Sequence, residues 1–443
     1  MLHGPLLDFG RLSRFFAIVV LLASGVVAAP VRADESDSYL PNEVVVKLDV
    51  SADVAAVARA YGLDPSPIDR FGTRPIYRLR ILDGGDPVRR AAELLNDPKE
   101  RVIYAEPNYV GQTPEGRQRV SWFSGGSSDE YASQWAPDTI QLREAHRIAR
   151  GSGVTVAVLD TGVDATHPAL SGRVLSGYDF VDMDAQPNEV GVRGENLAFG
   201  HGTHVAGLVA LAAPDAKIMP VRVLDPDGTG NMWVLAEALD YAADQGADVI
   251  NMSLSTTRQT NLLREVVADV TCRLEEDGFA DGEEGEGEEG DSEEGGEGEE
   301  DGEGCTTSGQ RGVVVVAAAG NSGSTTPEYP AAEGVTGLLS VAATTSTDNL
   351  ASFSNRSSWV NVAAPGEKIL SAVPGGGYAT WSGTSMAAPL TAGEAALVRS
   401  AYPTANSAQV VYRILSTATT ISGPVSPRIN AAAAVGALNS TSD

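Results

Sequence analysis

The stretch VTVAVLD, residues 154–160, is a short, continuous run of aliphatic residues that ends on an acid. Four similar apolar runs follow it along the chain, separated by helix-like segments: IMPVRVL, DVINMSL, VVVVAAAG and LLSVAAT. Apolar runs that alternate with helices predict a parallel sheet covered by helices on both faces, and therefore an α/β fold. Ligands of such sheets bind at the carboxyl ends of the strands. We therefore expect Asp160 to lie at a binding edge.

A second stretch, SGTSMAAP at residues 382–389, places Ser385 ahead of an Ala-rich segment that predicts a helix over residues 386–401. At the start of a helix, free backbone N–H groups and the helix dipole favour negative charge. This position suits an oxygen nucleophile. It equally suits a helix cap, because serine is a favoured capping residue.

Two further motifs decide between these alternatives: AVLDTGVD contains Asp160, and GHGTHVAG contains His201. A carboxylate that orients an imidazole, an imidazole that removes a proton and a hydroxyl that attacks are the three parts of a hydrolytic triad. The chain has only five histidines, so few others compete for the role of the base. The motifs predict a catalytic triad of Asp160, His201 and Ser385.

The composition is that of a folded, acidic protein. The chain has 443 residues, of which 42% are hydrophobic, and a formal net charge of -28. This is enough apolar material for a large core, and the length allows two or three domains. A nucleic-acid partner is disfavoured because a strongly negative chain is repelled by phosphates.

The first 33 residues have the pattern of a targeting segment. Arg11 and Arg14 precede an apolar run, and a small-residue site that ends at Ala33 follows it. This order predicts a secretory signal peptide over residues 1–33 and export to the periplasm or the extracellular space. A membrane anchor is the alternative, but the apolar run is shorter than the roughly 20 residues needed to span a bilayer. We expect no stable membrane insertion.

Residues 40–110 form a separate unit in which strand-like and helix-like segments alternate, as in a small α+β domain. Residues 111–132 begin with a segment of Gly, Pro, Ser and Arg, which predicts an exposed, cleavable linker. A signal peptide, a small domain and a cleavable linker together suggest a zymogen. An ordinary N-terminal domain has the same pattern.

Residues 133–438 resemble the subtilisin-like serine proteases, because DTGVD, GHGTHVAG and GTSMAAP occur there in the order of that family. Residues 40–110 resemble the inhibitor-type propeptides of the same family. The resemblance implies a seven-stranded parallel sheet with helices on both faces, preceded by a ferredoxin-like α+β propeptide. It implies a serine endopeptidase that is made as a zymogen, works through an acyl-enzyme and processes itself. The implied partners are polypeptide substrates and the chain's own propeptide, which acts as inhibitor and folding aid in a monomer.

The resemblance also assigns an oxyanion hole. Asn321 matches the family residue whose side-chain amide holds the oxyanion together with the backbone N–H of Ser385, and preorganised donors of this kind stabilise the charge as it develops. The alternative for Asn321 is a turn residue before Ser322 and Gly323. His204 matches a second histidine of the same helix, for which a structural role is expected.

Substrates of the family pair with two exposed backbone segments, which here would be residues 227–231 and 253–255. The pocket that sets the specificity would lie between residues 253–255 and 318–320. Matching positions imply a set of substrate-binding residues. They are Gly228, Thr229, Gly230, Ser253, Leu254, Ser255, Ala318, Ala319, Gly320 and Glu328.

Glu328 departs from the family pattern, in which a glycine or another small neutral residue is common. A carboxylate inside the pocket favours cleavage after Lys or Arg, because it pairs with their charge. The alternative is a Glu328 that points to solvent, as most glutamates do. If the carboxylate lines the pocket, Arg117 or Arg119 becomes a candidate self-processing site.

The chemistry requires no cofactor, and structural calcium has little support in the sequence. The family's tightest calcium site uses an acid nine residues after the catalytic aspartate, and here Ala169 occupies that position. The family's calcium-binding loop has no room at residues 210–214. Asp182 and Asp184 have the oxygen ligands that Ca²⁺ prefers, but surface acids are the alternative, and no particular calcium site is predicted.

An acidic insertion at residues 273–304 has no counterpart in the family pattern. Residues 275–303 contain 17 acids and no Lys or Arg, which predicts a disordered loop. Cys272 and Cys305, the only cysteines, flank this loop. In an exported protein they are expected to form a disulfide that closes it, with two unpaired thiols as the alternative.

A noncatalytic relative that binds extended peptides is the competing function, and the presence of all four catalytic residue types disfavours it. An α/β-hydrolase esterase is disfavoured because that fold orders its triad Ser, Asp, His and places the serine in a G-x-S-x-G elbow.

Overall fold

The computed structural model describes residues 38–117, 123–272, 311–422 and 427–436. The predicted signal peptide, the acidic insertion and Cys305 lie outside the described residues. No helix in the described ranges combines the length and the apolar character that a membrane crossing requires.

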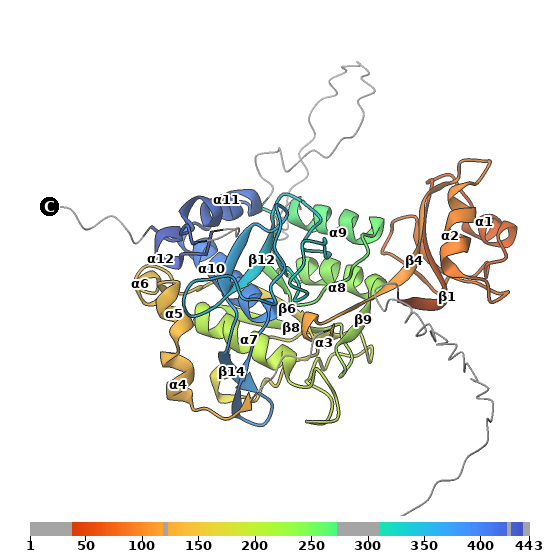
Figure 1. Cartoon of the computed structure of the whole chain (residues 1–443). Helices are drawn as coiled ribbons and strands as arrows, with labels where there is room; N and C mark the ends of the chain where they lie inside the picture. Colours follow the sequence, from red (N-terminus) through yellow and green to blue (C-terminus); the bar gives the residue numbers. More distant parts are fainter. Residues whose placement is uncertain (1–37, 118–122, 273–310, 423–426, 437–443) are drawn as a thin grey trace, which may run out of the picture. The chain divides into compact units, whose positions relative to one another are not determined.

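A seven-stranded parallel sheet forms the centre of the larger part of the chain (Figure 1), which confirms the predicted fold class. Its strand order is β13-β12-β11-β10-β6-β8-β7, and every neighbouring pair is parallel. The strands are β6 (Thr155–Asp160), β7 (Tyr178–Asp179), β8 (Lys217–Arg222), β10 (Val249–Met252), β11 (Val314–Ala318), β12 (Leu338–Thr344) and β13 (Val362–Pro365). β6, the first of the apolar runs, lies in the interior of the sheet between β10 and β8.

Helices cover both faces of this sheet because alternate side chains of each strand point in opposite directions. Val156 and Val158 of β6 belong to the core shared with α7 (His201–Ala212) and α10 (Thr384–Ala401). Ala157 and Leu159 belong to the core on the opposite face. The helices of this opposite core are α8 (Met232–Asp244) and α9 (Asn261–Cys272). The core that contains α7 and α10 also includes α11 (Ser407–Thr417) and α12 (Ala431–Ala434).

Shorter elements complete this part of the chain. β14 (Ile369–Val373), β15 (Gly377–Trp381) and β5 (Phe123–Ser124) form a small antiparallel sheet. The remaining helices before and after β6 are α4 (Ser128–Ser133), α5 (Trp135–Thr139), α6 (Leu142–Ala145) and the 3-10 helix η2 (Pro168–Leu170).

The N-terminal unit is an antiparallel sheet with two helices and its own core. Its elements are β1 (Tyr39–Leu48), α1 (Val54–Ala60), β2 (Asp69–Arg70), β3 (Ile76–Arg80), α2 (Pro87–Leu95) and β4 (Val102–Gln112). The strand order β2-β3-β1-β4 is the ferredoxin-like arrangement that the resemblance implies.

This unit contacts α8 and α9 through polar caps as well as apolar residues. The carboxylate of Glu106 in β4 accepts hydrogen bonds from the backbone N–H groups of Asn261 (2.7 Å) and Leu262 (3.1 Å), at the start of α9. The side-chain oxygen of Asn108 accepts one from the N–H of Trp233 (3.2 Å), at the start of α8. Free N–H groups at a helix start need such acceptors, so the N-terminal unit completes both helices.

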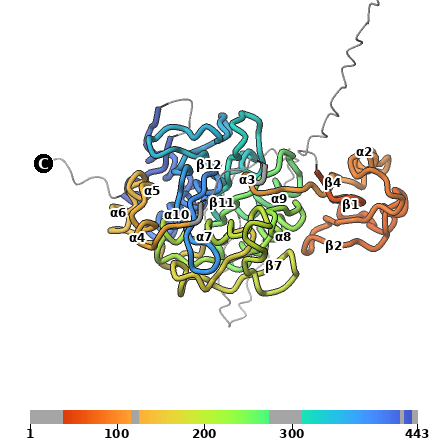
Figure 2. The backbone as a smooth tube through the Cα atoms, turned by 60° about the horizontal axis from the view of Figure 1, so that its bottom comes forward, coloured from red at the N-terminus to blue at the C-terminus, as the bar shows by residue number. Residues whose placement is uncertain are grey.

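The predicted exposed linker is wrong for its first residues. β4 extends to Gln112 and pairs antiparallel with β9 (Thr229–Asn231), and Gly111, Thr113 and Pro114 are buried. Figure 2 shows the chain after β4 running to the short helix α3 (Pro114–Arg117). Composition suggested a free tether because Gly and Pro favour turns, but backbone pairing with β9 requires no apolar pattern.

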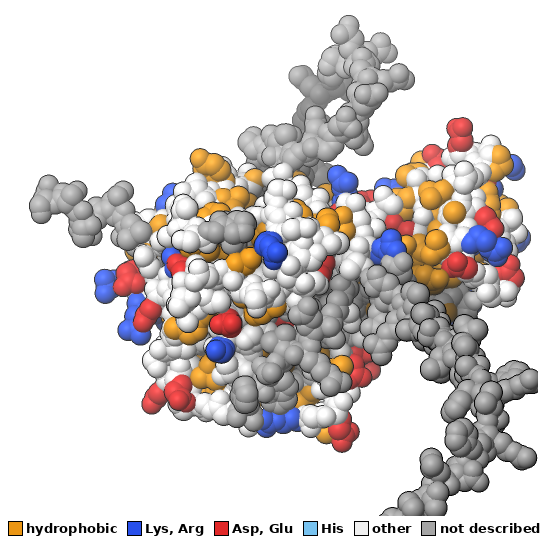
Figure 3. Space-filling model, in the orientation of Figure 1, with side chains coloured by type: hydrophobic (Ala, Val, Ile, Leu, Met, Phe, Trp, Pro, Cys, Tyr) orange, Lys and Arg blue, Asp and Glu red, His pale blue; other side chains and the backbone are white. Residues whose placement is uncertain are grey.

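Charged side chains are interspersed on the visible face of the described residues (Figure 3). The 17 acids of residues 275–303, which supply much of the net charge of -28, lie outside those residues.

Glu394 is an unusual core residue of α10, because its side chain is fully buried in the helix that also carries Ser385. Burial raises the pKa of its carboxyl to about 8, although the backbone of Asn430 and the charge of Arg428 act in the opposite direction. The carboxyl is therefore neutral at low pH in the folded protein.

We expect the free energy of unfolding to fall as the pH rises from about 4.5 to about 8, since over this range the unfolded carboxyl loses its proton while the folded one keeps it. The loss is on the order of 5 kcal/mol and levels off above the folded pKa. Urea unfolding across this range measures it, with Ser385→Ala as the parent protein so that the self-processing expected from the resemblance cannot interfere. Adding Glu394→Gln removes this titrating group and should make the profile shallower, while other buried carboxyls with a raised pKa, such as Glu189 and Glu333, keep their contributions. Equal pH dependence in the two proteins would contradict the assignment.

Candidate active site

The site lies at the carboxyl edge of the central sheet, where strand ends meet the first turns of two helices. Asp160 is the last residue of β6, Ser253 follows β10, and Asn321 lies three residues after β11. His201 begins α7, and Ser385 is the second residue of α10. The structure thus brings together residues from motifs that are far apart in the chain.

Asp160 and His201 are joined by a buried hydrogen bond. His201 Nδ1 lies 2.7 Å from Asp160 Oδ1, and both side chains are almost fully buried. The same oxygen accepts a hydrogen bond from the backbone N–H of Thr161 (2.8 Å). This arrangement fixes the orientation of the imidazole and leaves Nε2 available to a partner on the opposite side of the ring.

Ser385 is held at the start of α10 by contacts with the end of β10. Its hydroxyl lies 3.4 Å from the carbonyl oxygen of Ser253, and the Ser253 hydroxyl donates to the carbonyl of Ser385 (3.1 Å). The side-chain amide of Asn251 in turn donates to the Ser253 hydroxyl (3.0 Å).

The side chain of Asn321 has a fixed orientation. Its Oδ1 accepts hydrogen bonds from the backbone N–H (2.9 Å) and the hydroxyl (3.0 Å) of Thr384. The N–H of Gly320 donates to that hydroxyl (3.1 Å). Because Oδ1 is occupied, the Nδ2 donor points toward Ser385, where it can receive negative charge on a neighbouring oxygen.

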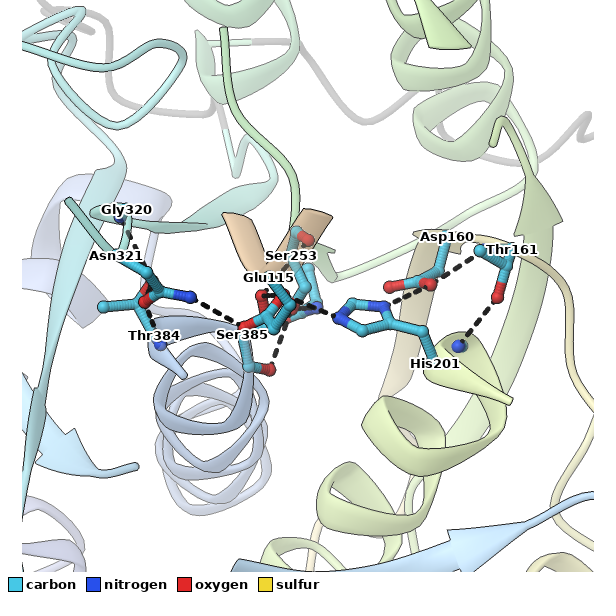
Figure 4. Close-up of polar contacts among 11 residues, drawn as sticks. Glu115, Asp160, Thr161, His201, Ser253, Gly320, Asn321, Thr384 and Ser385 are labelled. Carbon is cyan, nitrogen blue, oxygen red and sulfur yellow. Dashed lines mark hydrogen bonds and ion pairs between the residues drawn. The ribbon is translucent and has the colours of Figure 1, made fainter. Parts of the chain in front are cut away.

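Glu115, from the segment that follows β4, occupies the centre of this arrangement (Figure 4). Its Oε2 accepts a hydrogen bond from the Ser385 hydroxyl (2.8 Å) and lies 3.2 Å from His201 Nε2. Its Oε1 accepts one from Asn321 Nδ2 (2.9 Å). One carboxylate therefore contacts the three groups that sequence motifs place at the site.

Sequence reasoning missed Glu115 because it treated residues 111–132 as a linker. Its position in the chain is what brings it to the site: Glu115 lies three residues after Gln112, which pairs with β9. Gln112 also exchanges backbone hydrogen bonds with Ser255 (3.0 and 2.9 Å), and the N–H of Thr113 donates to the carbonyl of Gly228 (2.9 Å). The two segments expected to bind a peptide thus hold the chain's own strand.

The expected pocket residues are also close together. Glu328 is 3% exposed, so the solvent-facing alternative is wrong. Its carboxylate accepts hydrogen bonds from the hydroxyls of Ser255 (2.6 Å) and Ser322 (3.1 Å) and from Asn355 Nδ2 (2.9 Å). A Cβ atom built on Gly320 would lie 2.5 Å from Glu328 Oε2, so the carboxylate lies against the 318–320 segment.

Comparison with known proteins identifies the family. The model of the Subtilase family matches residues 151–436, and that of the fervidolysin N-terminal prodomain matches residues 26–108. The chain is 34% identical to a thermophilic serine proteinase from Bacillus sp. (strain AK1), over 88% of this chain and 85% of that protein. It is 38% identical to thermitase from Thermoactinomyces vulgaris, over 67% of this chain and 92% of thermitase. The chain belongs to the subtilase family. It is therefore a serine-type endopeptidase with an N-terminal prodomain.

The fold of this subtilase also resembles a solved structure that contains both parts. The crystal structure of fervidolysin from Fervidobacterium pennivorans, a keratinolytic enzyme related to subtilisin, superposes with a TM-score of 0.67 at 24% identity. The match covers 90% of this chain and 61% of the fervidolysin chain.

The electrostatics of the site favour a charged imidazole while Glu115 is present. Burial alone lowers the pKa of His201, but the Asp160 carboxylate and then Glu115 outweigh it and raise that pKa to about 10. A protonated imidazole cannot accept the proton of Ser385.

His204, the second histidine of α7, is fully buried, and burial lowers its pKa to about 3. Its neutral ring stacks on Trp381, with centroids 4.9 Å apart, and its Nε2 donates to the carbonyl of Ala379 (3.0 Å). These contacts are those of a packing residue.

In the parts of the chain that the structure describes, no group of three or more His, Cys, Asp or Glu residues is placed to hold a metal ion. Of the two acids considered for a cation, Asp182 pairs with Arg222, which also binds Asp179 at 2.7 Å.

We predict that Glu115→Gln lowers the pKa of His201 in the unprocessed subtilase by about one unit or more, because one of the two carboxylates that stabilise the imidazolium loses its charge. NMR titration of labelled histidine in the Ser385→Ala precursor, with and without Glu115→Gln, measures the shift. His204 is the internal control and should stay neutral in both. A His201 that titrates near pH 6.5 in both proteins would refute the contact.

Proposed function

We propose that this subtilase is a secreted serine endopeptidase, made as a zymogen, that cleaves peptide bonds through Asp160, His201 and Ser385. The observation that carries this proposal is the convergence of the Ser385 hydroxyl, His201 Nε2 and Asn321 Nδ2 on one carboxylate. Acyl transfer needs a nucleophile that attacks the substrate carbonyl, a base that takes the proton of the nucleophile, and a preorganised donor that stabilises the resulting oxyanion.

The proposed reaction follows from these distances once Glu115 has left. His201 Nε2 accepts the proton of Ser385 as Oγ attacks the substrate carbonyl, and Asp160 stabilises the imidazolium. Asn321 Nδ2 and the Ser385 N–H stabilise the tetrahedral oxyanion. His201 then returns the proton to the leaving amine, and water repeats the sequence on the acyl-enzyme.

Glu115 gives the proposed zymogen a specific means of inhibition. Its carboxylate occupies the position between Ser385 and Asn321 where the oxyanion forms, and its charge favours the protonated state of His201. Residues up to Thr113 are bound as an extended strand, but the group that meets the nucleophile is a side-chain carboxylate and not a peptide carbonyl. The bound segment therefore resists hydrolysis until Glu115 is displaced.

A noncatalytic peptide-binding protein would retain the strand pairing at β9 and Ser255 but would not need the buried His201–Asp160 bond or the fixed amide of Asn321. The catalytic proposal explains all three features.

A fluorophosphonate probe tests the proposal, because it labels only a serine that is activated by its base. We expect the processed protein to be labelled at Ser385 and Ser385→Ala to remain unlabelled. In the unprocessed chain, Glu115→Gln should react at least about tenfold faster than the parent, since about 1.4 kcal/mol of blocking interaction corresponds to that factor. No labelling of a processed, folded parent would exclude the catalytic function.

We further propose that Glu328 directs cleavage after Lys or Arg. Its buried carboxylate lies against Gly320 and Ser255, the two walls assigned to the primary pocket. Its oxygens accept hydrogen bonds from Ser255, Ser322 and Asn355. A bound Lys or Arg side chain would meet this charge in a water-poor environment, where a charge-assisted hydrogen bond is strong.

Glu328→Gln should lower kcat/KM for Arg substrates by about 10- to 100-fold relative to Leu substrates, because each 1.4 kcal/mol of lost charge pairing is tenfold in rate. Peptide libraries that vary the residue before the cleaved bond measure this ratio. Glu333→Gln, another buried carboxyl five residues away, is the matched control and should leave it unchanged. Equal rates on Arg and Leu substrates in the parent would refute the proposal.

Export through residues 1–33, self-processing near Arg117 or Arg119, and the disulfide between Cys272 and Cys305 complete the proposal. Arg119 and Cys305 lie outside the described residues, so these remain predictions from the sequence.

A further inference from the structure

The loop between β7 and α7 packs directly on the segment that follows Asp160. The N–H of Val163 donates to the carbonyl of Pro187 (3.0 Å). Gly162 has a φ of +108°, and a Cβ atom on it would lie 2.3 Å from the carbonyl oxygen of Asn188. The close backbone contact places the next residue of the loop, Glu189, beside the catalytic groups.

Glu189 joins two segments that each carry a proposed catalytic residue. Its Oε1 accepts a hydrogen bond from the hydroxyl of Thr161 (2.7 Å), the residue after Asp160. Its Oε2 accepts hydrogen bonds from the backbone N–H (3.1 Å) and the hydroxyl (2.9 Å) of Thr203, two residues after His201. The part-buried carboxylate of Glu189 thus accepts hydrogen bonds from both segments.

The start of α7 needs these acceptors. The residue at its N-cap position is Gly200, which has no side chain to accept a hydrogen bond, and the first N–H groups of a helix lack partners within the helix. Thr161 Oγ1 accepts a hydrogen bond from the N–H of Gly202 (2.9 Å), while Glu189 accepts one from the N–H of Thr203. A carboxylate is well suited here because the helix dipole favours negative charge at this end.

The start of α7 and the segment after β6 also lie too close together for a residue larger than glycine at position 202. A Cβ atom on Gly202 would lie 2.1 Å from the carbonyl oxygen of Gly162 and 3.1 Å from the Cβ of Asp160. The distance between the Asp160 carboxylate and the His201 ring is therefore set by how these two segments are held together. The hydrogen bonds of Glu189 span that junction.

We propose that Glu189 is a positioning residue for the subtilase reaction, whose carboxylate holds the first turn of α7 against the segment after Asp160 and so aligns His201. The inference rests on the proposed triad. Glu189 contacts neither the substrate position nor the reacting atoms, and it acts through Thr161 and Thr203.

A role in stability alone does not account for this location. Burial, with a smaller contribution from the charge of Asp160, raises the pKa of Glu189 to about 7. A second carboxylate next to Asp160 is thus costly in its charged form, and a neutral capping side chain would satisfy the helix with less repulsion.

The test measures kcat and KM per active site, after titration of processed enzyme with a fluorophosphonate. Glu189→Ala should lower kcat by roughly 10- to 100-fold and leave KM within about twofold, because a small displacement of the base affects the reaction more than binding. Glu189→Gln, which keeps the size and one acceptor oxygen, should recover part of the loss. Glu195→Gln, an exposed acid in the same loop, is the charge-matched control and should equal the parent.

Thr203→Val provides a second variant that removes one donor without touching Glu189. It should lower kcat, and its effect should be less than additive with that of Glu189→Ala, whereas Thr203→Ser should retain the activity. If kcat per titrated site stays within twofold of the parent in Glu189→Ala and Thr203→Val, the inference is overturned, even if thermal stability falls. A processed parent that the probe does not label would instead overturn the proposed triad.

Discussion

The close packing of α7 against α10 is the constraint on which the site depends. A Cβ atom on Gly393 of α10 would lie 2.2 Å from the Cβ of Ala212 at the far end of α7, so the two helices meet with almost no side chain between them. α7 also lies close to β14: a Cβ atom on Gly207 of α7 would lie 2.2 Å from the hydroxyl of Ser371 in β14. Small residues let the helices lie on one face of the sheet with both N-termini at its carboxyl edge. His201 and Ser385 are neighbours for this reason.

The sheet supplies the other half of the geometry. β6 lies between β10 and β8, and β10 lies between β11 and β6, so Asp160 and Ser253 come from adjacent strand ends and Asn321 from the loop after the next. Each polar group at this edge is held by another: Thr161 by Glu189, Asn321 by Thr384, and Ser253 by Asn251. Such chains of hydrogen bonds leave little freedom for the reacting groups, and preorganisation of this kind is what electrostatic catalysis requires.

The same features that suit the site to a substrate also suit it to inhibition by its own N-terminal unit. Open backbone groups at β9 and Ser255 pair with residues 110–113, and the donors around Ser385 bind any oxygen that carries negative charge. Glu106 and Asn108 add a second attachment at the starts of α9 and α8. The segment that carries Glu115 is thus anchored at several points that precede Glu115 in the chain, and its position does not depend on Glu115 alone.

The α/β class and the order of the elements could be read from the sequence, and its motifs supplied the residues of the proposed triad, because apolar runs, helix composition and long motifs are local properties of the chain. The helix predicted over residues 386–401 is α10, Thr384–Ala401. The position of Glu115 could not be read from the sequence. No local feature of an acid in a segment with Gly and Pro shows whether that segment is a free linker or is bound at the site. Glu189 and the burial of Glu328 were hidden for the same reason: whether a carboxylate faces water or three hydrogen-bond donors depends on residues distant in the chain. The sequence by itself determined which chemical groups are available, and only the tertiary structure decided which of the acids meet the catalytic groups, because that depends on packing distances that no local pattern encodes.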